Sequence, residues 1–234
     1  MPNYVGGVGS VSPELMIIGE APGKYEDETG IPFAGPTGKI LDDCLFKAGI
    51  RRGDCFLTNV VKYRPPFNDF KKLHLIGVSL EESVKELWEN EINRLKPNCI
   101  LAVGNHALNA VCGVDGILNY RGSILSARDG VTKCVPCIHP AALFSRTEGE
   151  GNEAETKGGL SWVYIKLIES DINRAGEESK TKTLILPDRT LSIAHNSLDL
   201  HRFFREYEKL DKAACDIESI NCVHSCIGFA FNKH

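Results

Sequence analysis

Four short apolar runs, rich in β-branched residues, recur along the first 140 residues of the chain. Runs of about four to eight such residues between turn signals are typical of strands that are buried on both faces. The four runs are LMIIG at 15–19, FLTNVV at 56–61, CILAVG at 99–104 and CVPCI at 134–138. Each run therefore predicts one buried strand.

Helical patterns separate these runs. Ser79 begins a capping box at the start of one helix, and Pro97 stops that helix. Asn105 is a candidate cap for a later helix that ends at Gly113. An earlier helix ends before Gly49, and its apolar positions share one face: Ile40, Leu41, Cys44, Leu45 and Ala48.

Alternating strands and helices predict a parallel sheet that helices cover on both faces. We therefore expect an α/β fold, a three-layer α/β/α sandwich with a central, mainly parallel four-stranded sheet. The acidic stretch 148–155 is expected to form an exposed loop, helical periodicity resumes at 159–175, and AGEESKTKT at 175–183 is expected to be a linker. The expected division is one domain at residues 1–178 and a linker with a short β-rich segment at 179–234.

Composition narrows the class of protein. Hydrophobic residues make up 42% of the 234 residues and charged residues 25%, which is average for a globular protein. No stretch approaches the roughly 18 apolar residues that span a bilayer, and the N-terminus lacks the pattern of a signal peptide. Most of the nine cysteines lie in apolar runs, which favours reduced thiols. We expect a soluble cytoplasmic protein with no membrane partner.

The net charge of −4 argues against a surface that is basic throughout. Residues 51–75 nevertheless carry six basic side chains against two acidic ones. A nucleic acid would therefore bind at this local patch. The candidate phosphate-binding residues are Lys62, Arg64, Lys71 and Lys72.

Polar motifs follow three of the predicted strands, where ligands of parallel sheets usually bind. The first is GEAPG at 19–23 and the last is HPAAL at 139–143, while NVVKYRPPFN at 59–68 follows the second run. Alone, GEAPG fits a phosphate-binding turn or a plain strand-to-helix connection. It lacks the Lys-Ser/Thr of a nucleotide-binding P-loop, which weakens a nucleotide-binding enzyme as an interpretation.

Together with Glu26 and the GIPFAG motif at 30–35, these motifs resemble those of the uracil-DNA glycosylase superfamily, most closely those of its family 4. The resemblance covers roughly residues 12–175 in the expected order. It implies a glycosylase that hydrolyses the N-glycosidic bond of flipped-out uracil in single-stranded or mispaired DNA. The alternative is a non-catalytic module that binds uracil or DNA.

The resemblance also implies roles for individual residues. Breaking the glycosidic bond creates an oxocarbenium-like sugar and a uracil anion, which calls for a carboxylate and a hydrogen-bond donor. Glu20 would orient or stabilise around the attacking water, and His139 would stabilise the leaving base, with support from Glu26 and Asn68. The substrate-binding candidates are Gly19, Ala21, Pro22 and Gly23 for close backbone approach, Phe33 for stacking and Asn59 for reading uracil.

Three of these residues have plausible structural roles instead. His139 could cap a strand end, Phe33 could belong to the core, and Glu26 could be a solvated loop carboxylate. The functional interpretation rests on all of the motifs occurring together and in order.

The chain departs from family 4 at the cofactor. Members of that family hold a four-iron four-sulfur cluster through a C-x-x-C before the first strand, a cysteine in K-C-R-P-P and one early in the next helix. Here residues 1–14 have no cysteine, and Tyr63 stands in K-Y-R-P-P. Cys134 and Cys137 are three apart on a predicted strand, so they would point to opposite faces and share no metal. We expect no cofactor and no metal.

The C-terminal segment suggests a second context. KAACDIESINCVHSCIGFAF predicts two strands, with Asp216 and Glu218 two apart on the first. This D-x-E pattern resembles the first motif of the 3′–5′ exonuclease domain of polymerase I-type enzymes, and paired carboxylates can bind divalent ions. The chain reaches position 234 without further motifs of such a nuclease. It would therefore be a monomer or the N-terminal module of a longer, phage-like DNA polymerase.

Overall fold

The computed structural model describes residues 2–144 and 161–184, a few helical residues between 198 and 205, and the backbone of two strands at 213–220 and 223–231. The chain divides into two compact units, residues 1–186 and 187–234. The acidic stretch 148–155 lies outside the described residues.

The first unit contains a six-stranded sheet in the order β1–β3–β2–β4–β6–β5. The four expected strands pair in parallel at its centre: β2 (Leu15–Gly19), β3 (Phe56–Asn59), β4 (Cys99–Val103) and β6 (Lys133–Cys137). The expectation of four strands was wrong by two, because β1 (Val8–Gly9) and β5 (Leu125–Ser126) add antiparallel edges. Two-residue strands are too short to show a period in the sequence.

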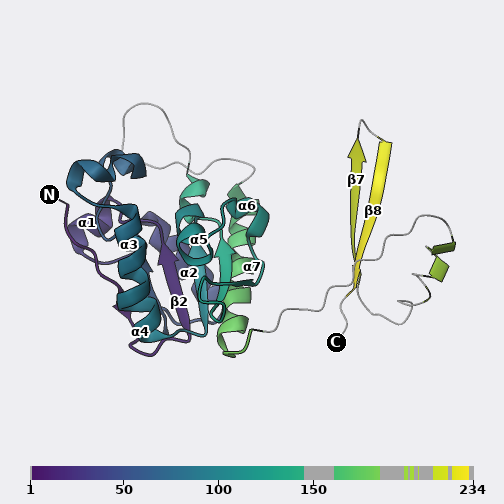
Figure 1. The fold of residues 1–234 in the computed structure, drawn as a ribbon, viewed down its shortest axis with the longest axis horizontal. Coiled ribbons are helices and arrows are strands. Elements are labelled where there is room, and N and C mark those ends of the chain that lie inside the picture. The colour runs from purple at the N-terminus through teal and green to yellow at the C-terminus, as the bar shows by residue number, and fades with distance from the viewer. Residues whose placement is uncertain are drawn as a thin grey trace. The chain divides into compact units, whose positions relative to one another are not determined.

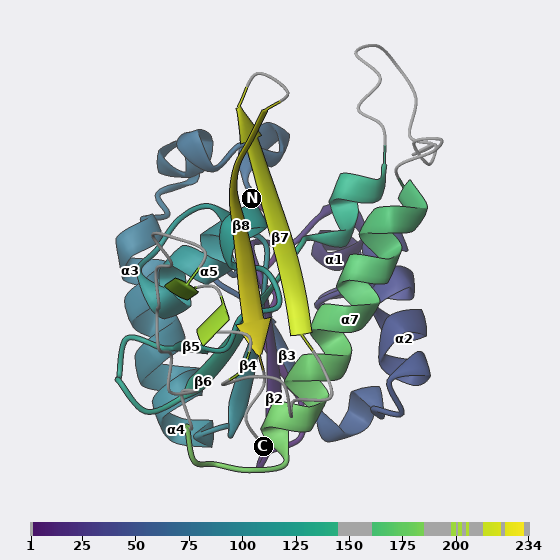
Figure 2. The ribbon, with the colours of Figure 1, turned by 90° about the vertical axis from the view of Figure 1, so that its right-hand side faces the viewer.

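Helices cover both faces of the sheet, which gives the expected three layers (Figures 1 and 2). On one face lie α2 (Pro36–Lys47) and α7 (Ser161–Ser179), and on the other lie α3 (Leu80–Glu86) and α5 (Asn105–Cys112). The chain after α3 continues as the π-helical η4 (Leu87–Ile92) and α4 (Asn93–Leu95). The remaining helices are short: α1 (Lys24–Thr29), α6 (Ile117–Tyr120), η1 (Arg52–Asp54), η2 (Pro66–Asn68), η3 (Phe70–Ile76) and η5 (Pro140–Leu143).

Helix ends follow the sequence signals with two corrections. Ser79 caps α3 by accepting a hydrogen bond from the Glu82 amide, and Gly49 adopts a left-handed φ of 70° after α2. Asn105 is the first residue of α5 and not its cap; its Oδ1 instead accepts hydrogen bonds from the amides of residues 116 and 117. α7 extends to Ser179, so the first five residues of the expected linker 175–183 are helical.

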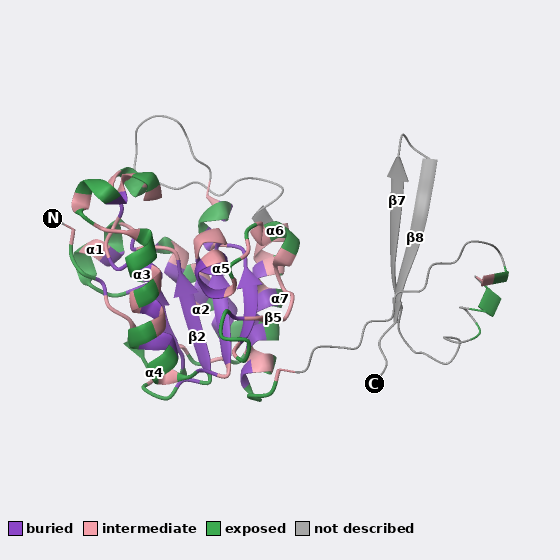
Figure 3. Ribbon diagram, in the orientation of Figure 1, coloured by how far each residue is buried: buried purple, intermediate pink, exposed green. Residues whose placement is uncertain are grey.

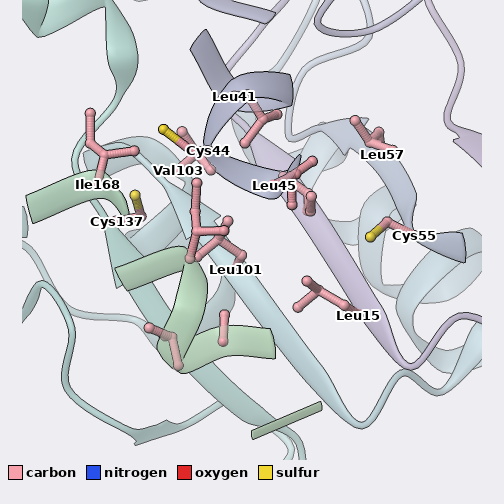
Figure 4. Packing of buried hydrophobic residues seen from close by; sticks show 14 of the residues in the cluster. Leu15, Leu41, Cys44, Leu45, Cys55, Leu57, Leu101, Val103, Cys137 and Ile168 are labelled. Carbon is pink, nitrogen blue, oxygen red and sulfur yellow. The ribbon is translucent and has the colours of Figure 1, made fainter. Parts of the chain in front are cut away.

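The core forms two hydrophobic clusters, one on each face of the sheet. Figure 4 shows the first, in which α2 and α7 pack on one face of β2, β3 and β4. Its members include Leu41, Leu45, Leu101 and Ile168. Leu87, Ile100 and Val111 belong to the second cluster, under η4 and α5. The four parallel strands are buried along their whole length (Figure 3), as their apolar sequences predict.

Residues along a strand alternate between the two faces of the sheet, as Cys134 and Cys137 on β6 show. Cys134 belongs to one cluster and Cys137 to the other, so the two thiols lie on opposite faces of β6 as predicted.

Among the helices that the structure describes, none is long and apolar enough to cross a bilayer.

The second unit contains the expected pair of strands, β7 (Ala213–Ile220) and β8 (Val223–Phe231), in an antiparallel hairpin. Asp216 pairs with Gly228 and Glu218 with Cys226, and the register shifts between Glu218 and Ser219.

Candidate active site

The polar motifs gather at the carboxyl-terminal edge of the parallel strands. Gly19 ends β2 and is paired with Asn59, which ends β3. The pairing continues into the loops, because the Val61 amide donates to the Glu20 carbonyl oxygen over 3.1 Å. His139 follows β6 at the same edge. Sheet geometry therefore places three separated sequence motifs side by side.

Gly19, Phe33 and Asn59 are in direct contact. A Cβ atom added to Gly19 would lie 2.4 Å from Asn59 Oδ1 and 2.7 Å from Phe33 Cζ. Only glycine leaves room for both side chains here. Phe33 and Asn59 are nearly fully buried, and Phe33 belongs to the hydrophobic cluster under α2, so an aromatic ring and an amide are packed together beside the end of β2.

The backbone of Phe33 is held in an unusual conformation. Its φ is 56°, a left-handed value that is rare for a bulky residue and indicates a functional or structural constraint. Arg52 donates to the Pro32 carbonyl oxygen over 2.8 Å and pairs with Asp42 on α2. Gly38 packs against the Phe33 carbonyl group from the other side, where a Cβ atom would lie 1.8 Å from the oxygen.

Glu20 is fixed at the start of α5. Its Oε1 accepts a hydrogen bond of 3.0 Å from the His106 amide, where the helix dipole favours a negative charge. Gly104 has a left-handed φ of 97°, and a Cβ atom there would lie 2.4 Å from the same oxygen. The carboxylate is only partly buried, so it remains open toward the site.

Glu26 joins two of the motifs. Its Oε2 accepts from the Gly23 amide and its Oε1 from the Gly35 amide, each over 3.0 Å. The side chain is buried and both of its oxygens accept hydrogen bonds, so Glu26 is not a solvated loop carboxylate, and its expected role in the site stays a prediction. Ala21 and Pro22 lie between β2 and α1, in the loop that Glu26 stabilises.

His139 has a defined tautomer. Its Nδ1 accepts a hydrogen bond of 3.1 Å from the Ala141 amide, so the proton of the neutral ring resides on Nε2. Burial lowers the pKa of His139, while the carboxylates of Glu20 and Glu26 oppose this shift. The imidazole is therefore neutral at pH 7 and offers one N–H donor.

Asn68 and the flanking cations lie farther out on the same edge. Asn68 is exposed, and its Oδ1 accepts a hydrogen bond of 3.1 Å from Arg64 Nε. Lys71 and Lys72 belong to η3, and Lys72 is 4.0 Å from Asp69. Asn68 is therefore exposed and bonded to Arg64. The contacts of the described residues include none between Asn68 and Phe33 or Asn59.

Lys62 was wrongly expected to contact DNA, because the structure buries it to 2% exposure. Its Nζ donates to the Thr58 hydroxyl (2.5 Å), the Asn59 carbonyl oxygen (2.8 Å) and Glu91 Oε2 (2.8 Å). Three acceptors match the three donors of an ammonium group. Burial lowers the pKa of Lys62, and Glu91 counteracts this. Lys62 therefore stabilises the end of β3 from within.

The residues at the expected cluster position do not fit an iron–sulfur cluster. Tyr63 packs edge-to-face on Tyr4 with ring centroids 5.5 Å apart, and the Tyr4 hydroxyl donates to Glu86 Oε1 over 3.0 Å. Burial, reinforced by Glu86, raises the pKa of Tyr4 to about 12. Such clusters are held by thiolates, and these side chains offer only oxygen donors. The cysteines of the described residues lie elsewhere, at Cys44, Cys55, Cys99, Cys112, Cys134 and Cys137.

Three contributors to the site were not predicted from the sequence. The first is Glu91, which lies between Leu87 and Leu95 on the apolar face of its helix. A charged residue on such a face indicates a buried ion pair, here with Lys62. The rings of His106 and Phe70 stack with centroids 3.8 Å apart and planes 11° apart. This contact joins segments that are 36 positions apart in the chain, and no local pattern marks it.

The fold is an α/β/α sandwich, and one edge of its sheet brings a buried aromatic ring and an amide together with a carboxylate and a neutral imidazole. The chain belongs to the uracil-DNA glycosylase superfamily, whose family model matches residues 7–158. It is therefore a DNA glycosylase, a hydrolase of N-glycosyl bonds.

Curated relatives support this assignment. The type-4 uracil-DNA glycosylase of Pyrobaculum aerophilum is 36% identical over 151 residues, which cover 62% of this chain and 74% of that protein. The enzyme of the same name from Thermotoga maritima is 34% identical over 152 residues, covering 63% and 75%. That of Saccharolobus solfataricus is 37% identical over 151 residues, covering 61% and 67%.

Proposed function

We propose that this chain removes uracil from DNA by hydrolysing the N-glycosidic bond of a flipped-out deoxyuridine, in single-stranded or mispaired substrates. The observation that carries the proposal is that the packed cluster of Gly19, Phe33 and Asn59 lies at the same edge of the sheet as Glu20 and His139. The type-4 relatives support the same substrate.

Phe33 and Asn59 supply the recognition step of this proposal. A base inside a duplex is unreachable, so it is extruded and stacked in a pocket. The Phe33 ring offers the stacking face, and the Asn59 amide donates to uracil O4 while accepting from N3–H. Cytosine reverses this pattern of donor and acceptor, so the buried amide would reject it.

Glu20 and His139 supply the chemistry. As the bond between C1′ and N1 breaks, its electron pair passes to the uracil ring and positive charge develops on the sugar. The Nε2–H of His139 donates to uracil O2, where the negative charge accumulates. Glu20 stabilises the positive sugar and orients the water whose oxygen adds to C1′, and the proton that this water loses neutralises the uracil anion. Glu26 keeps the two glycine-rich loops in register around these groups.

A strand-cleavage assay tests this function. A labelled single-stranded oligonucleotide with one uracil is incubated with the chain and heated in alkali, which breaks DNA only at abasic sites. We expect cleavage at the uracil position and none in the matched thymine oligonucleotide. Binding to the uracil oligonucleotide without cleavage would establish the alternative, a non-catalytic uracil-binding module of a DNA polymerase.

For residues 187–234 we propose the start of an exonuclease-like domain of a phage-like DNA polymerase. The support is the β7–β8 hairpin with Asp216 and Glu218 two positions apart on β7. Because two carboxylates alone do not complete a nuclease site, we expect no shortening of a 3′-labelled oligonucleotide with Mg²⁺. Shortening that Asp216→Asn abolishes would instead show a complete nuclease.

A further inference from the structure

Phe67 is an exposed aromatic residue at the active-site edge. Its side chain is 83% exposed, and its φ of 58° is left-handed, followed by 56° at Asn68. Asparagine tolerates this conformation, but a bulky residue without a polar side chain rarely adopts it. The surrounding turn holds Phe67 there through hydrogen bonds from the Asn68 and Asp69 amides to the Pro65 and Pro66 carbonyl oxygens. The chain thus fixes a hydrophobic ring in solvent.

The segment that carries Phe67 is anchored to the catalytic edge. Phe70, three residues later, stacks on the ring of His106, and the His106 amide holds Glu20. Residues 66–76, blue in Figure 1, lie at the end of the sheet where β2 and β3 terminate. The exposed ring therefore has a fixed position relative to Glu20.

One basic side chain contacts this ring, and two others lie close to it in the sequence. Lys72 Nζ lies 4.4 Å from the centroid of the Phe67 ring, which is a cation–π contact. Arg64 bonds to the adjacent Asn68, and Lys71 neighbours Lys72 on η3. Asp69 is the one acidic residue among positions 64–74. An aromatic face among cations matches single-stranded DNA, whose bases stack on rings while its phosphates meet cations.

We propose that Phe67 is a stacking platform for an unpaired base next to the flipped uracil in single-stranded DNA, with Arg64, Lys71 and Lys72 holding the adjacent phosphates. This inference rests on the proposed glycosylase function and names the path that the strand takes from the pocket. It adds a binding position outside the uracil pocket.

Three variants test the platform. Phe67→Asn removes the ring and suits the left-handed backbone, whereas Phe67→Trp keeps a stacking face. Phe46→Ala is the matched control, because Phe46 is 84% exposed on α2 near its C-terminal end, away from the motifs. Circular dichroism melting establishes that each variant is folded.

The first measurement is uracil excision from single-stranded DNA. Stacking of one base contributes about 1–3 kcal/mol, so Phe67→Asn should raise KM by roughly 5- to 150-fold with kcat within about twofold. Phe67→Trp and Phe46→Ala should match wild type. An unchanged KM in Phe67→Asn overturns the platform, as does an increase confined to duplex U:G substrates, which would indicate a wedge between paired bases.

The second measurement separates the platform from the glycosylase function. A single strand carries 2-aminopurine beside a non-hydrolysable 2′-fluoro-deoxyuridine, and aromatic stacking changes the fluorescence of 2-aminopurine. We expect wild type and Phe67→Trp to change this fluorescence on binding and Phe67→Asn not to do so. An equal change in all variants overturns the platform. A wild type that shows the change but excises no uracil would contradict catalysis while supporting the platform.

Discussion

Single residues in this site owe their properties to specific neighbours. Glu20 and Glu26 are both carboxylates, but Glu26 has both oxygens engaged by backbone amides, whereas Glu20 has one such bond and remains partly exposed. His139 is neutral because burial lowers its pKa and because Ala141 occupies Nδ1. Side-chain chemistry alone does not distinguish these roles; hydrogen-bond partners do.

The tautomer of His139 has a consequence for pH dependence. The folded pKa lies below the ordinary value of 6.5, so the neutral imidazole persists as the pH falls through 6.5. At lower pH its Nδ1 gains a proton and can no longer accept the hydrogen bond from the Ala141 amide that orients the ring. Single-turnover excision rates measured from pH 4.5 to 8.5 should therefore be flat above about 6.5. The acid limb should have its midpoint below that value. A midpoint at pH 7 or above would contradict a His139 side chain that is neutral at pH 7.

At the scale of elements, the π-helical turn η4 (Leu87–Ile92) brings a charge to the core. Glu91 lies in this turn and meets Lys62, which itself holds the carbonyl group of Asn59 at the end of β3. π-helical turns often occur at functional sites. Here the turn connects a helix of one layer to the strand end that carries Asn59, the residue proposed to read the base.

The Lys62–Glu91 pair predicts a double-mutant result. Lys62→Met should lower the free energy of unfolding by about 3–5 kcal/mol, because Glu91 is left buried without its partner. Lys62→Met combined with Glu91→Leu should recover most of this loss. Urea denaturation measures both values.

The pair of the exposed Lys47 with Glu169 provides the control. Because Glu169 also pairs with Lys166, Lys47→Met should cost no more than about 1 kcal/mol. A loss below 1 kcal/mol in Lys62→Met would show that the buried pair does not stabilise the end of β3.

The parallel strands could be predicted from the sequence because each is buried on both faces and therefore uniformly apolar. The edge strands β1 and β5 could not, because two residues carry no pattern. Lys62 was misplaced because a count of local charges ignores a partner 29 positions away. The motif residues were found because they follow strand ends, whereas Phe70 and His106 meet only in the folded chain.

At the scale of the whole molecule, the net charge of −4 conceals an uneven distribution. In the basic segment, Arg52 forms an ion pair with Asp42, and Lys62 forms one with Glu91. Arg64, Lys71 and Lys72 remain beside the active-site edge. DNA binding by this acidic chain should therefore depend on a few local cations.

The salt dependence of binding tests this distribution. Each phosphate contact to single-stranded DNA contributes about 0.7 to the slope of log K against log salt. Lys71→Ala with Lys72→Ala should make the slope shallower by roughly 1 to 1.4 and leave the preference for uracil unchanged. The control is Lys166→Ala with Lys180→Ala, an equal charge change at exposed sites on and after α7. A wild-type slope in the first double variant would place the DNA elsewhere.

The catalysis proposed for this chain is release, by His139 and Glu20, of the base held by Phe33 and Asn59. Its most direct test is the single-turnover rate of free uracil release, followed by mass spectrometry, for wild type and His139→Ala at saturating enzyme. Removing one preorganised donor to a developing anion should slow this rate by on the order of 10²-fold or more, with oligonucleotide binding retained. A His139→Ala rate within twofold of wild type would contradict the account.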